Sequence, residues 1–239
     1  MPRRPSFTRR WLTAATWPVG ISLTSWDYMW RTTVLHRSEL AERDPGPHLP
    51  FPYPAAVDAS EVQSVDDGVG PLFHRRYSAR IKGADLGSEE LIATIKRDLN
   101  AAAPTRLARF QRVLGDGDAL DTGDEYVVRM PGPWDGPVRV IAQTPRSFRL
   151  ATLDGHLEAG QIEFRADDDD HVLRFTIESW ARSADRLSNL LYHRVGMAKE
   201  VQLHMWISFL EGAAKLAHGS IEDDGIEIDT RRVDAFGAA

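Results

Sequence analysis

One helical pattern from Asp185 to His218, more than thirty residues long, restricts the fold more than any other feature. At about 1.5 Å per residue it would be about 50 Å long, and its apolar positions fall on one stripe. Ser183 or Asp185 suits the N-cap, and Gly219 suits the position just past the end. The preceding strands are therefore expected to wrap around this stripe, which consists of Leu187, Leu190, Leu191, Ala198, Val201, Met205, Phe209, Gly212 and Leu216.

The second half of this helix carries another apolar line on the opposite side. A helix that is apolar all round is buried on both sides, so a segment other than the sheet is expected to cover this back. Arg194 lies inside the first stripe and allows two interpretations. Its guanidinium reaches water or a carboxylate, or it anchors a polar group inside a cavity. The second line consists of Leu203, Ile207, Leu210 and Ala214.

Strand patterns separated by turn signals precede the helix. We expect strands at 72–81, 124–130, 136–143, 147–153, 161–165 and 172–180, with 110–114 as a further candidate. A short helix begins at Ser88, its expected N-cap, and another begins at Pro104. The aspartates at 167–170 are expected at a solvated hairpin tip. This order predicts an α+β domain at 71–218, in which a curved antiparallel sheet grips a long C-terminal helix.

Three segments flank the predicted domain. Residues 1–40 form a Trp/Arg-rich N-terminal helical extension, residues 41–70 a Pro-rich linker, and residues 219–239 a polar C-terminal tail with a peripheral strand. The extension is expected to cover the back of the long helix by burying Trp26 and Trp30. The alternatives are a homodimer interface, or a peripheral membrane or partner contact through the same two side chains.

Composition excludes several classes of protein. The net charge of −6 argues against nucleic acid as a partner. The absence of cysteine excludes disulfides, thiolate metal sites and cysteine nucleophiles, and it agrees with a cytoplasmic location. No run of 18 apolar residues is present, so a membrane span is not expected.

The densest polar cluster lies at 154–160, with Glu163 on the strand that follows. His156 and Glu158 point to the same side in extended backbone. They are expected either to bond to the loop backbone and hold the hairpin, or to act as an acid/base pair or half a metal site. No phosphate-binding, dinucleotide or metalloprotease motif is present, so no cofactor and no metal are predicted.

The run from Phe148 to Phe164, FRLATLDGHLEAGQIEF, resembles the signature of the DUF1990 (UPF0548) family. In that signature an aromatic strand leads through T-L-x-G-H-x-E-x-G into an acidic strand. The resemblance covers residues 70–218 and leaves out the N-terminal extension. It implies the START/Bet v 1-like helix-grip superfamily (SRPBCC), whose members bind lipids, polyketides or other apolar molecules. Some members are cyclases or hydrolases, but DUF1990 itself implies no activity.

The predicted function is the binding of a small, largely apolar molecule in a cavity between sheet and helix. One alternative is a cyclase, hydratase or hydrolase in the same cavity, with His156 as acid/base, Glu158 as its orienting carboxylate and Arg194 stabilising an oxyanion. Another is an interaction or membrane module acting through residues 1–40. A one-residue error in strand parity would turn the ligand-binding candidates outward. They are Tyr126, Val128, Val140, Phe148, Leu150, Phe175, Ile177, Met205 and Phe209.

Overall fold

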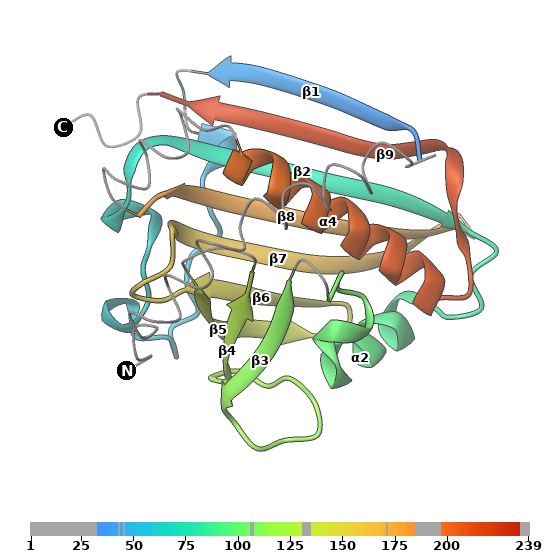
Figure 1. Cartoon of the computed structure of the whole chain (residues 1–239), viewed down its shortest axis with the longest axis horizontal. Coiled ribbons are helices and arrows are strands. Elements are labelled where there is room, and N and C mark those ends of the chain that lie inside the picture. Colours follow the sequence, from blue (N-terminus) through green and yellow to red (C-terminus); the bar gives the residue numbers. More distant parts are fainter. Residues whose placement is uncertain are drawn as a thin grey trace.

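The computed structural model describes residues 33–42, 44, 46–105, 108–130, 135–170, 172–184 and 197–234. In this part of the chain nine strands form one sheet, in the order β1-β9-β2-β8-β7-β6-β5-β4-β3 (Figure 1). All neighbours are antiparallel except β1 and β9. The strands are β1 Leu35–Glu42, β2 Val69–Lys82, β3 Arg109–Leu114, β4 Glu125–Arg129, β5 Gly136–Thr144, β6 Ser147–Thr152, β7 Glu158–Asp169, β8 Val172–Ser183 and β9 Ser220–Val233.

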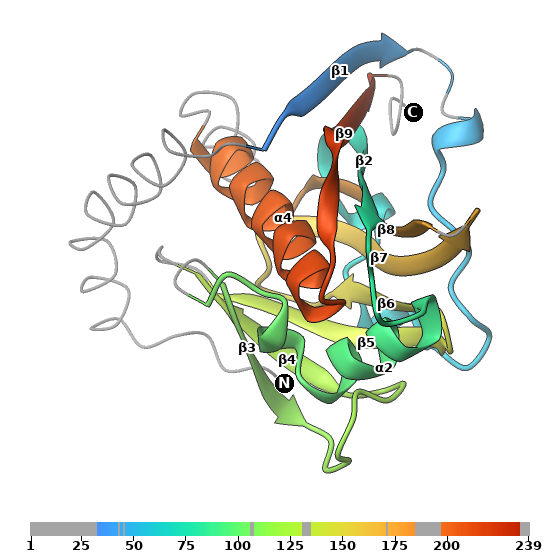
Figure 2. The same ribbon diagram turned by 90° about the vertical axis from the view of Figure 1, so that its right-hand side faces the viewer.

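The sheet curls around the long helix α4, Met197–Leu216, which crosses its concave face (Figure 2). Helix α2, Ser88–Arg97, and the short turn η4, Leu99–Ala101, lie near the end of α4. Three further short turns are η1 Gly46–His48, η2 Ala59–Glu61 and η3 Val65–Asp67. The molecule is therefore an α+β protein with a mostly antiparallel sheet, as the order of elements predicts.

Aromatic rings form the centre of the contact between α4 and the sheet. Phe164 stacks on Phe148 with 4.7 Å between ring centroids, and Phe209 of α4 lies 5.1 Å from Phe164 and 6.1 Å from Phe175. Trp206 meets Phe164 edge-on at 5.6 Å. Each such ring buries a large apolar area, so this cluster is the main link between the two layers.

The two ends of the predicted helix have different outcomes. Residues 185–196, which include Arg194, lie outside the described residues, so the predicted start is not tested. The helix ends at Leu216 because His218 adopts a left-handed conformation with φ 57°, and the His218 N–H donates to Lys215. Gly219 follows this turn and packs against Ile81, where a Cβ would lie 2.7 Å from a side-chain methyl. The helix is not C-terminal, because β9 follows it.

The orientation of α4 differs from the predicted stripe. Met205 and Phe209 belong to the main core as expected, but so do Trp206 and Ala213, which the stripe leaves out. Gly212 does not face the sheet; its Cα lies against the backbone of Ala102. The side of the helix away from the core carries polar side chains instead, namely His204, Ser208, Glu211 and Lys215.

The second apolar line of the helix is buried. Leu203, Ile207, Leu210 and Ala214 all belong to the same core cluster as the sheet residues. Strand β9 contacts α4 and adds Ile226 and Ile228 to this cluster. Part of the cover that we expected from residues 1–40 is thus supplied by the C-terminal strand. Trp26 and Trp30 lie outside the described residues.

The described parts of the flanking segments differ from the prediction. Leu35–Glu42 is strand β1 rather than the end of a helix, because it pairs in parallel with β9. The Pro-rich segment packs on the outer face of the sheet, where Val62 and Val65 are buried. Residues 220–233 form the expected strand, but β9 is not peripheral, because it lies inside the sheet between β1 and β2. Its alternating buried residues, Ile226, Ile228 and Thr230, explain why it fits there.

One local expectation needs correction, and another is only part of the picture. The N-cap of α2 is Gly87, and Ser88 is the first helical residue. The Ser88 hydroxyl and backbone N–H both donate to the Asp168 carboxylate, at 2.7 and 3.0 Å. Asp169 accepts from Arg80 and Arg174 at 3.1 and 2.8 Å. The acidic hairpin is therefore held by specific contacts, in addition to being solvated.

Candidate ligand-binding site

A row of side chains crosses the concave face through six neighbouring strands. Residues directly opposite each other in a ladder lie on the same face, so the register alone defines this row. Leu150 belongs to the main core, which places the whole row on the side of α4. In spatial order the row is Val140, Leu150, Ile162, Ser179, Arg75 and Thr230. Its first half is apolar and its second half is polar.

Arg75 is the charged member of this row, and it is only 2% exposed. Its guanidinium lies 3.7 Å from a carboxylate oxygen of Glu158 and 4.6 Å from the centroid of the Phe73 ring. The other Glu158 oxygen accepts a hydrogen bond of 2.8 Å from Gln202 of α4. At 3.7 Å the ion pair is longer than a direct hydrogen bond. A buried charge is thus held on the concave face by a strand and the helix.

Ser179 lies directly opposite Arg75 in the register of β2 and β8. It is 4% exposed, and its hydroxyl oxygen has no hydrogen-bond partner within the part of the chain that the structure describes. Leaving a buried hydroxyl unsatisfied costs free energy, and most buried polar groups have a partner. Ser179 and Arg75 are thus neighbouring polar residues at the point where the row changes from apolar to polar.

The predicted pair of His156 and Glu158 is held differently from an acid/base pair. The Nδ1 atom of His156 accepts the backbone N–H of Glu158 at 2.9 Å. The described contacts of the Glu158 carboxylate are with Arg75 and Gln202. Burial lowers the pKa of His156 and outweighs the opposing effect of Glu158, so the ring favours its neutral form. This geometry is the backbone-bonded alternative, and Arg194 lies outside the described residues.

The remaining residues of the T-L-D-G-H-L-E-A-G run shape the same hairpin. Gly155 has φ 94°, a left-handed conformation that favours glycine. A Cβ on Gly160 would lie 1.9 Å from the carbonyl oxygen of Trp180. The Gly160 N–H donates to the Thr152 hydroxyl at 3.0 Å. The motif therefore closes a tight hairpin that brings Glu158 to the polar end of the row.

All nine predicted ligand-binding residues face the core, and the seven that lie on strands have the parity that we expected. Each is buried and belongs to the main core. Phe148, Phe175 and Phe209 contact other rings in the aromatic cluster and occupy the space beneath the second half of α4. Val140 and Leu150 instead lie in the row that leads to Arg75. That these nine side chains line a ligand stays a prediction.

Sequence reasoning missed Arg75, Ser179 and Gln202. A signal for the first was present, because Arg75 lies on the same face of a predicted strand as the apolar residues Phe73 and Tyr77. An inward charged residue in such a strand is a candidate for function. Ser179 carries a weaker signal, as the inward neighbour of Ile177. Nothing in the sequence connects Gln202 to them.

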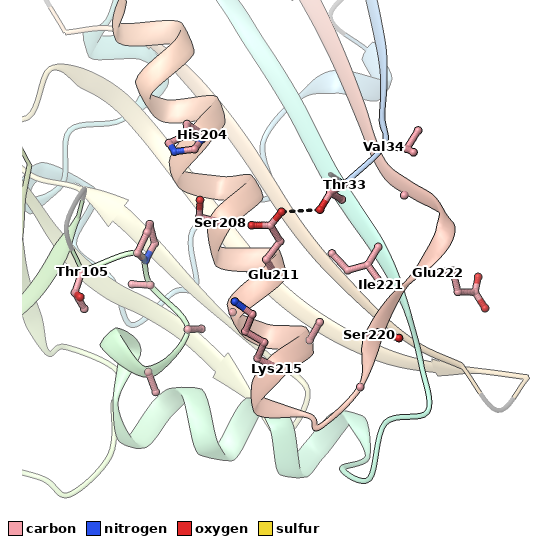
Figure 3. Close-up of a pocket in the computed structure, with 18 of the residues that line it drawn as sticks. Thr33, Val34, Thr105, His204, Ser208, Glu211, Lys215, Ser220, Ile221 and Glu222 are labelled. Carbon is pink, nitrogen blue, oxygen red and sulfur yellow. Dashed lines mark hydrogen bonds between the residues drawn. The ribbon is translucent and has the colours of Figure 1, made fainter. Parts of the chain in front are cut away.

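A separate cavity of about 1060 Å³ lies along the polar side of α4 (Figure 3). Its walls include residues 101–105, the chain at 219–223 and the two residues just before β1, Thr33 and Val34. The Thr33 hydroxyl donates to Glu211 at 2.8 Å and joins the start of the described chain to this side of the helix. Glu222, another wall residue, pairs with Arg80 at 2.8 Å. The cavity and the row containing Arg75 are thus on different sides of α4.

The described residues contain no group of three or more metal-ligating side chains in a suitable arrangement. Among the helices in the described ranges, none is both long and apolar enough to cross a membrane.

The model of DUF1990, a domain of unknown function, matches residues 59–208. This chain belongs to the DUF1990 family. The match begins within the segment predicted as a linker, and it includes the hairpin motif, Gln202 and every residue of the row except Thr230. No curated protein matches the chain.

Solved structures resemble the DUF1990 domain only loosely. A hypothetical protein of Helicobacter pylori is 12% identical, with a TM-score of 0.43 over 59% of this chain and 86% of that one. A norcoclaurine synthase variant from Thalictrum flavum, in complex with a transition-state analogue, is 8% identical, with a TM-score of 0.45 over 63% and 97%. A conserved protein of Geobacillus kaustophilus is 12% identical, with a TM-score of 0.41 over 61% and 95%. Likeness at this level says nothing about a ligand.

Proposed function

We propose that this protein binds a small, mostly apolar molecule with one oxygen-bearing polar group, between the concave face of the sheet and α4. The observation that carries the proposal is the neighbouring placement of Arg75 and Ser179 at the end of an apolar row. A few convergent polar groups beside an apolar surface are typical of small-molecule sites. The order of elements agrees with the helix-grip superfamily that the resemblance implies, in which ligands lie in the same place.

The chemistry of the row determines the kind of ligand. The apolar body of the molecule would lie on Val140, Leu150 and Ile162. A carboxylate or carbonyl oxygen would accept hydrogen bonds from Arg75 and Ser179, and a charge-assisted bond of this kind is about twice as strong as a neutral one. Glu158 and Gln202 would hold the guanidinium in place. Because a guanidinium is always charged, an acidic ligand is favoured over a neutral one of equal size.

The described contacts of His156 favour binding over catalysis. Its Nδ1 atom accepts the backbone N–H of Glu158, so in a neutral ring the Nε2 atom carries the proton and has no lone pair with which to act as a general base. A cyclase, hydratase or hydrolase activity thus remains only the alternative that the sequence suggests.

Fluorescence of 8-anilinonaphthalene-1-sulfonate, which combines an apolar body with an anionic group, tests the proposal. The purified protein is titrated with this probe, and the probe is then displaced with decanoate or with decanol. The wild type is expected to bind the probe and to prefer decanoate over decanol. Arg75→Met is expected to weaken decanoate binding by about tenfold or more, the usual effect of losing a hydrogen bond to a charged group, and to leave decanol binding nearly unchanged.

Matched variants separate binding from folding. Ser179→Ala removes the second donor, whereas Ser78→Ala removes a hydroxyl from the outer face of β2, next to Thr176. Circular dichroism shows whether Arg75→Met is folded. If it is not, Arg75→Lys, which keeps the positive charge, takes its place in the titration. A wild type that binds neither the probe nor decanoate overturns the proposal. Equal decanoate affinity in the folded Arg75 and Ser179 variants also overturns it.

A further inference from the structure

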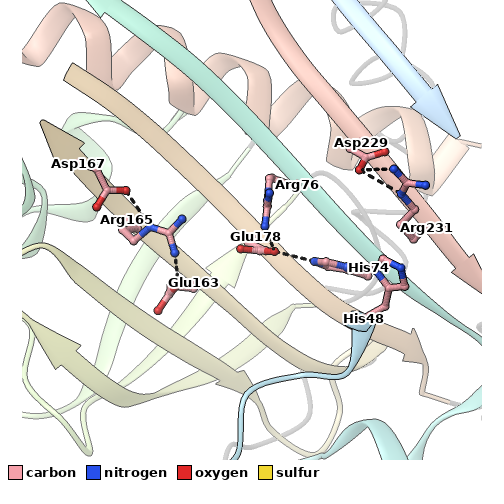
Figure 4. Close-up of polar contacts among 9 residues, drawn as sticks. All are labelled: His48, His74, Arg76, Glu163, Arg165, Asp167, Glu178, Asp229 and Arg231. Atoms are coloured by element: carbon pink, nitrogen blue, oxygen red, sulfur yellow. Dashed lines mark hydrogen bonds and ion pairs between the residues drawn. The ribbon is translucent and has the colours of Figure 1, made fainter. Parts of the chain in front are cut away.

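Two histidines face each other on the outer face of the sheet, away from the proposed ligand site (Figure 4). His48 comes from η1, in the Pro-rich segment, and His74 comes from β2. Their Nδ1 atoms are 3.0 Å apart, and their ring centroids are 5.2 Å apart at an angle of 45°. The side chains are 15% and 11% exposed, so the pair is enclosed but reachable from solvent.

The other nitrogen of each ring contacts a carboxylate. The Nε2 atom of His48 lies 2.7 Å from Glu42, and the Nε2 atom of His74 lies 2.7 Å from Glu178. A carboxylate only accepts hydrogen bonds, so each Nε2 carries the proton in these contacts. In a neutral ring the Nδ1 atom then presents a lone pair. With both rings neutral, two lone pairs would then face each other across 3.0 Å, and a cation between them would remove their repulsion.

We propose that His48 and His74 bind a divalent transition-metal ion such as Zn²⁺ through their Nδ1 atoms. Zn–N bonds of 2.0–2.1 Å at a tetrahedral angle put two nitrogens about 3.3 Å apart. The observed 3.0 Å is within a few tenths of an ångström of that distance. Histidines that ligate a metal almost always donate their other N–H to a carboxylate or carbonyl, and both rings meet this condition. Water or an exogenous donor completes the coordination.

The charges around the pair favour a cation. Three carboxylates surround it, those of Glu42, Glu178 and Asp229, the last on β9 near His74. Two guanidiniums offset them in part: Arg76 contacts Glu178 at 2.9 Å, and Arg231 contacts Glu42 at 3.1 Å. With neutral imidazoles this group carries one net negative charge, which a divalent ion reverses.

The metal would connect a peripheral segment to the sheet. His48 lies in the Pro-rich segment, which also contacts the outer face through Phe51, whose ring lies 5.1 Å from that of Trp180. His74 stacks on the same Trp180 ring at 5.1 Å. An ion that binds only the folded arrangement stabilises it by mass action. The ion is thus expected to raise the unfolding temperature and to protect the segment from proteolysis.

Isothermal titration of the EDTA-treated full chain with ZnCl₂ tests this site, with thermal unfolding as a second readout. The wild type is expected to bind Zn²⁺ and to unfold at a higher temperature with the ion than without it. ¹⁵N-histidine NMR is expected to show the change at Nδ1 rather than Nε2. His48→Ala and His74→Ala are expected to weaken binding at least about tenfold, the scale for disturbing a metal site.

The control is His218→Ala, because the His218 side chain is 69% exposed and lies far along the chain from His48 and His74, with Asp85 as its ion-pair partner. This variant is expected to bind Zn²⁺ like the wild type. The His48 variant changes a loop residue and keeps the test valid where His74→Ala does not fold. A wild type that takes up no Zn²⁺ overturns the proposal and leaves a shared proton between the rings. Equal Zn²⁺ affinity in the wild type and the folded His48 variant, or equal loss in His218→Ala, also overturns it.

Discussion

A Cβ atom on Gly212 would lie 2.1 Å from the carbonyl oxygen of Ala102. The backbone of helix α4 at Gly212 therefore packs directly on the backbone of the turn after η4, with no side chain between them. This contact holds the second half of the helix at its observed height above the sheet. It also explains why a glycine stands inside a helix, where it is otherwise unfavourable by about 1 kcal/mol relative to alanine.

Gly212→Ala is expected to destabilise the protein although alanine favours helices. The added methyl group forces a backbone shift, and overpacking of this kind costs about 1–3 kcal/mol or more. Urea unfolding followed by circular dichroism measures the change. Lys215→Ala, at an exposed position of the same helix, is expected to stay within about 0.5 kcal/mol of the wild type. A Gly212→Ala protein as stable as the wild type would contradict this contact.

The hairpin histidine makes stability depend on pH. Burial lowers the pKa of His156 below its ordinary value of 6.5, so the folded state resists a proton that the unfolded state accepts. Its contribution is fully present above pH 6.5 and is lost as the pH falls through the folded-state pKa. The difference in unfolding free energy between wild type and His156→Gln is thus expected to shrink from pH 7.5 to pH 5. A difference that stays constant over this range would show that the ring titrates equally in both states.

The acidic hairpin is expected to stabilise the start of α2. Asp168→Ala removes two hydrogen bonds to Ser88, a residue that is fully buried. The expected loss is about 1.5–3 kcal/mol of unfolding free energy, the range for hydrogen bonds to a charged group. Asp118→Ala, in an exposed loop, is the control and should change little. If both variants lose the same free energy, the contact with Ser88 contributes nothing specific.

The tryptophans before the described chain are predicted to be buried against the domain or against a second copy. The described chain begins at Thr33, whose hydroxyl donates to Glu211 on the polar side of α4. Acrylamide quenching of Trp26→Phe and Trp30→Phe tests this prediction, because each substitution should remove shielded emission. If the quenchable fraction of the emission falls in both variants, the side chains are exposed, and a membrane or partner contact is favoured instead.

Local patterns predicted most of the strands, because alternation is a property of neighbouring residues. The segment at 72–81 shows this, since Tyr77, Ala79 and Ile81 alternate inward in β2. The orientation of α4 was less accurate because glycine counts as apolar in a helical stripe. Because Gly212 was counted as apolar, the predicted stripe included the side of the helix that contacts the turn after η4. The side that faces the core instead includes Trp206 and Ala213.

Relationships between distant segments were not predictable in the same way. The polar end of the site joins Arg75 of β2 with Glu158 of β7 and Gln202 of α4. Which of these side chains meet depends on strand register and on the height of the helix, and neither is encoded within one segment. Strand β9 was underestimated because its acidic start hides the alternation of Ile226, Ile228 and Thr230.

The parallel pairing of β1 and β9 has a consequence for how the chain folds. Ser38 and Asp229 are opposite each other in this pair and hydrogen-bonded, although they lie 191 positions apart in the chain. Contacts across such a separation form late, because the loop between them must first lose its freedom. On the ribosome β1 emerges before β9, its only neighbour in the described sheet, and stays unpaired until β9 has been made. This edge of the sheet can therefore close only after synthesis has passed β9, about 190 positions after β1.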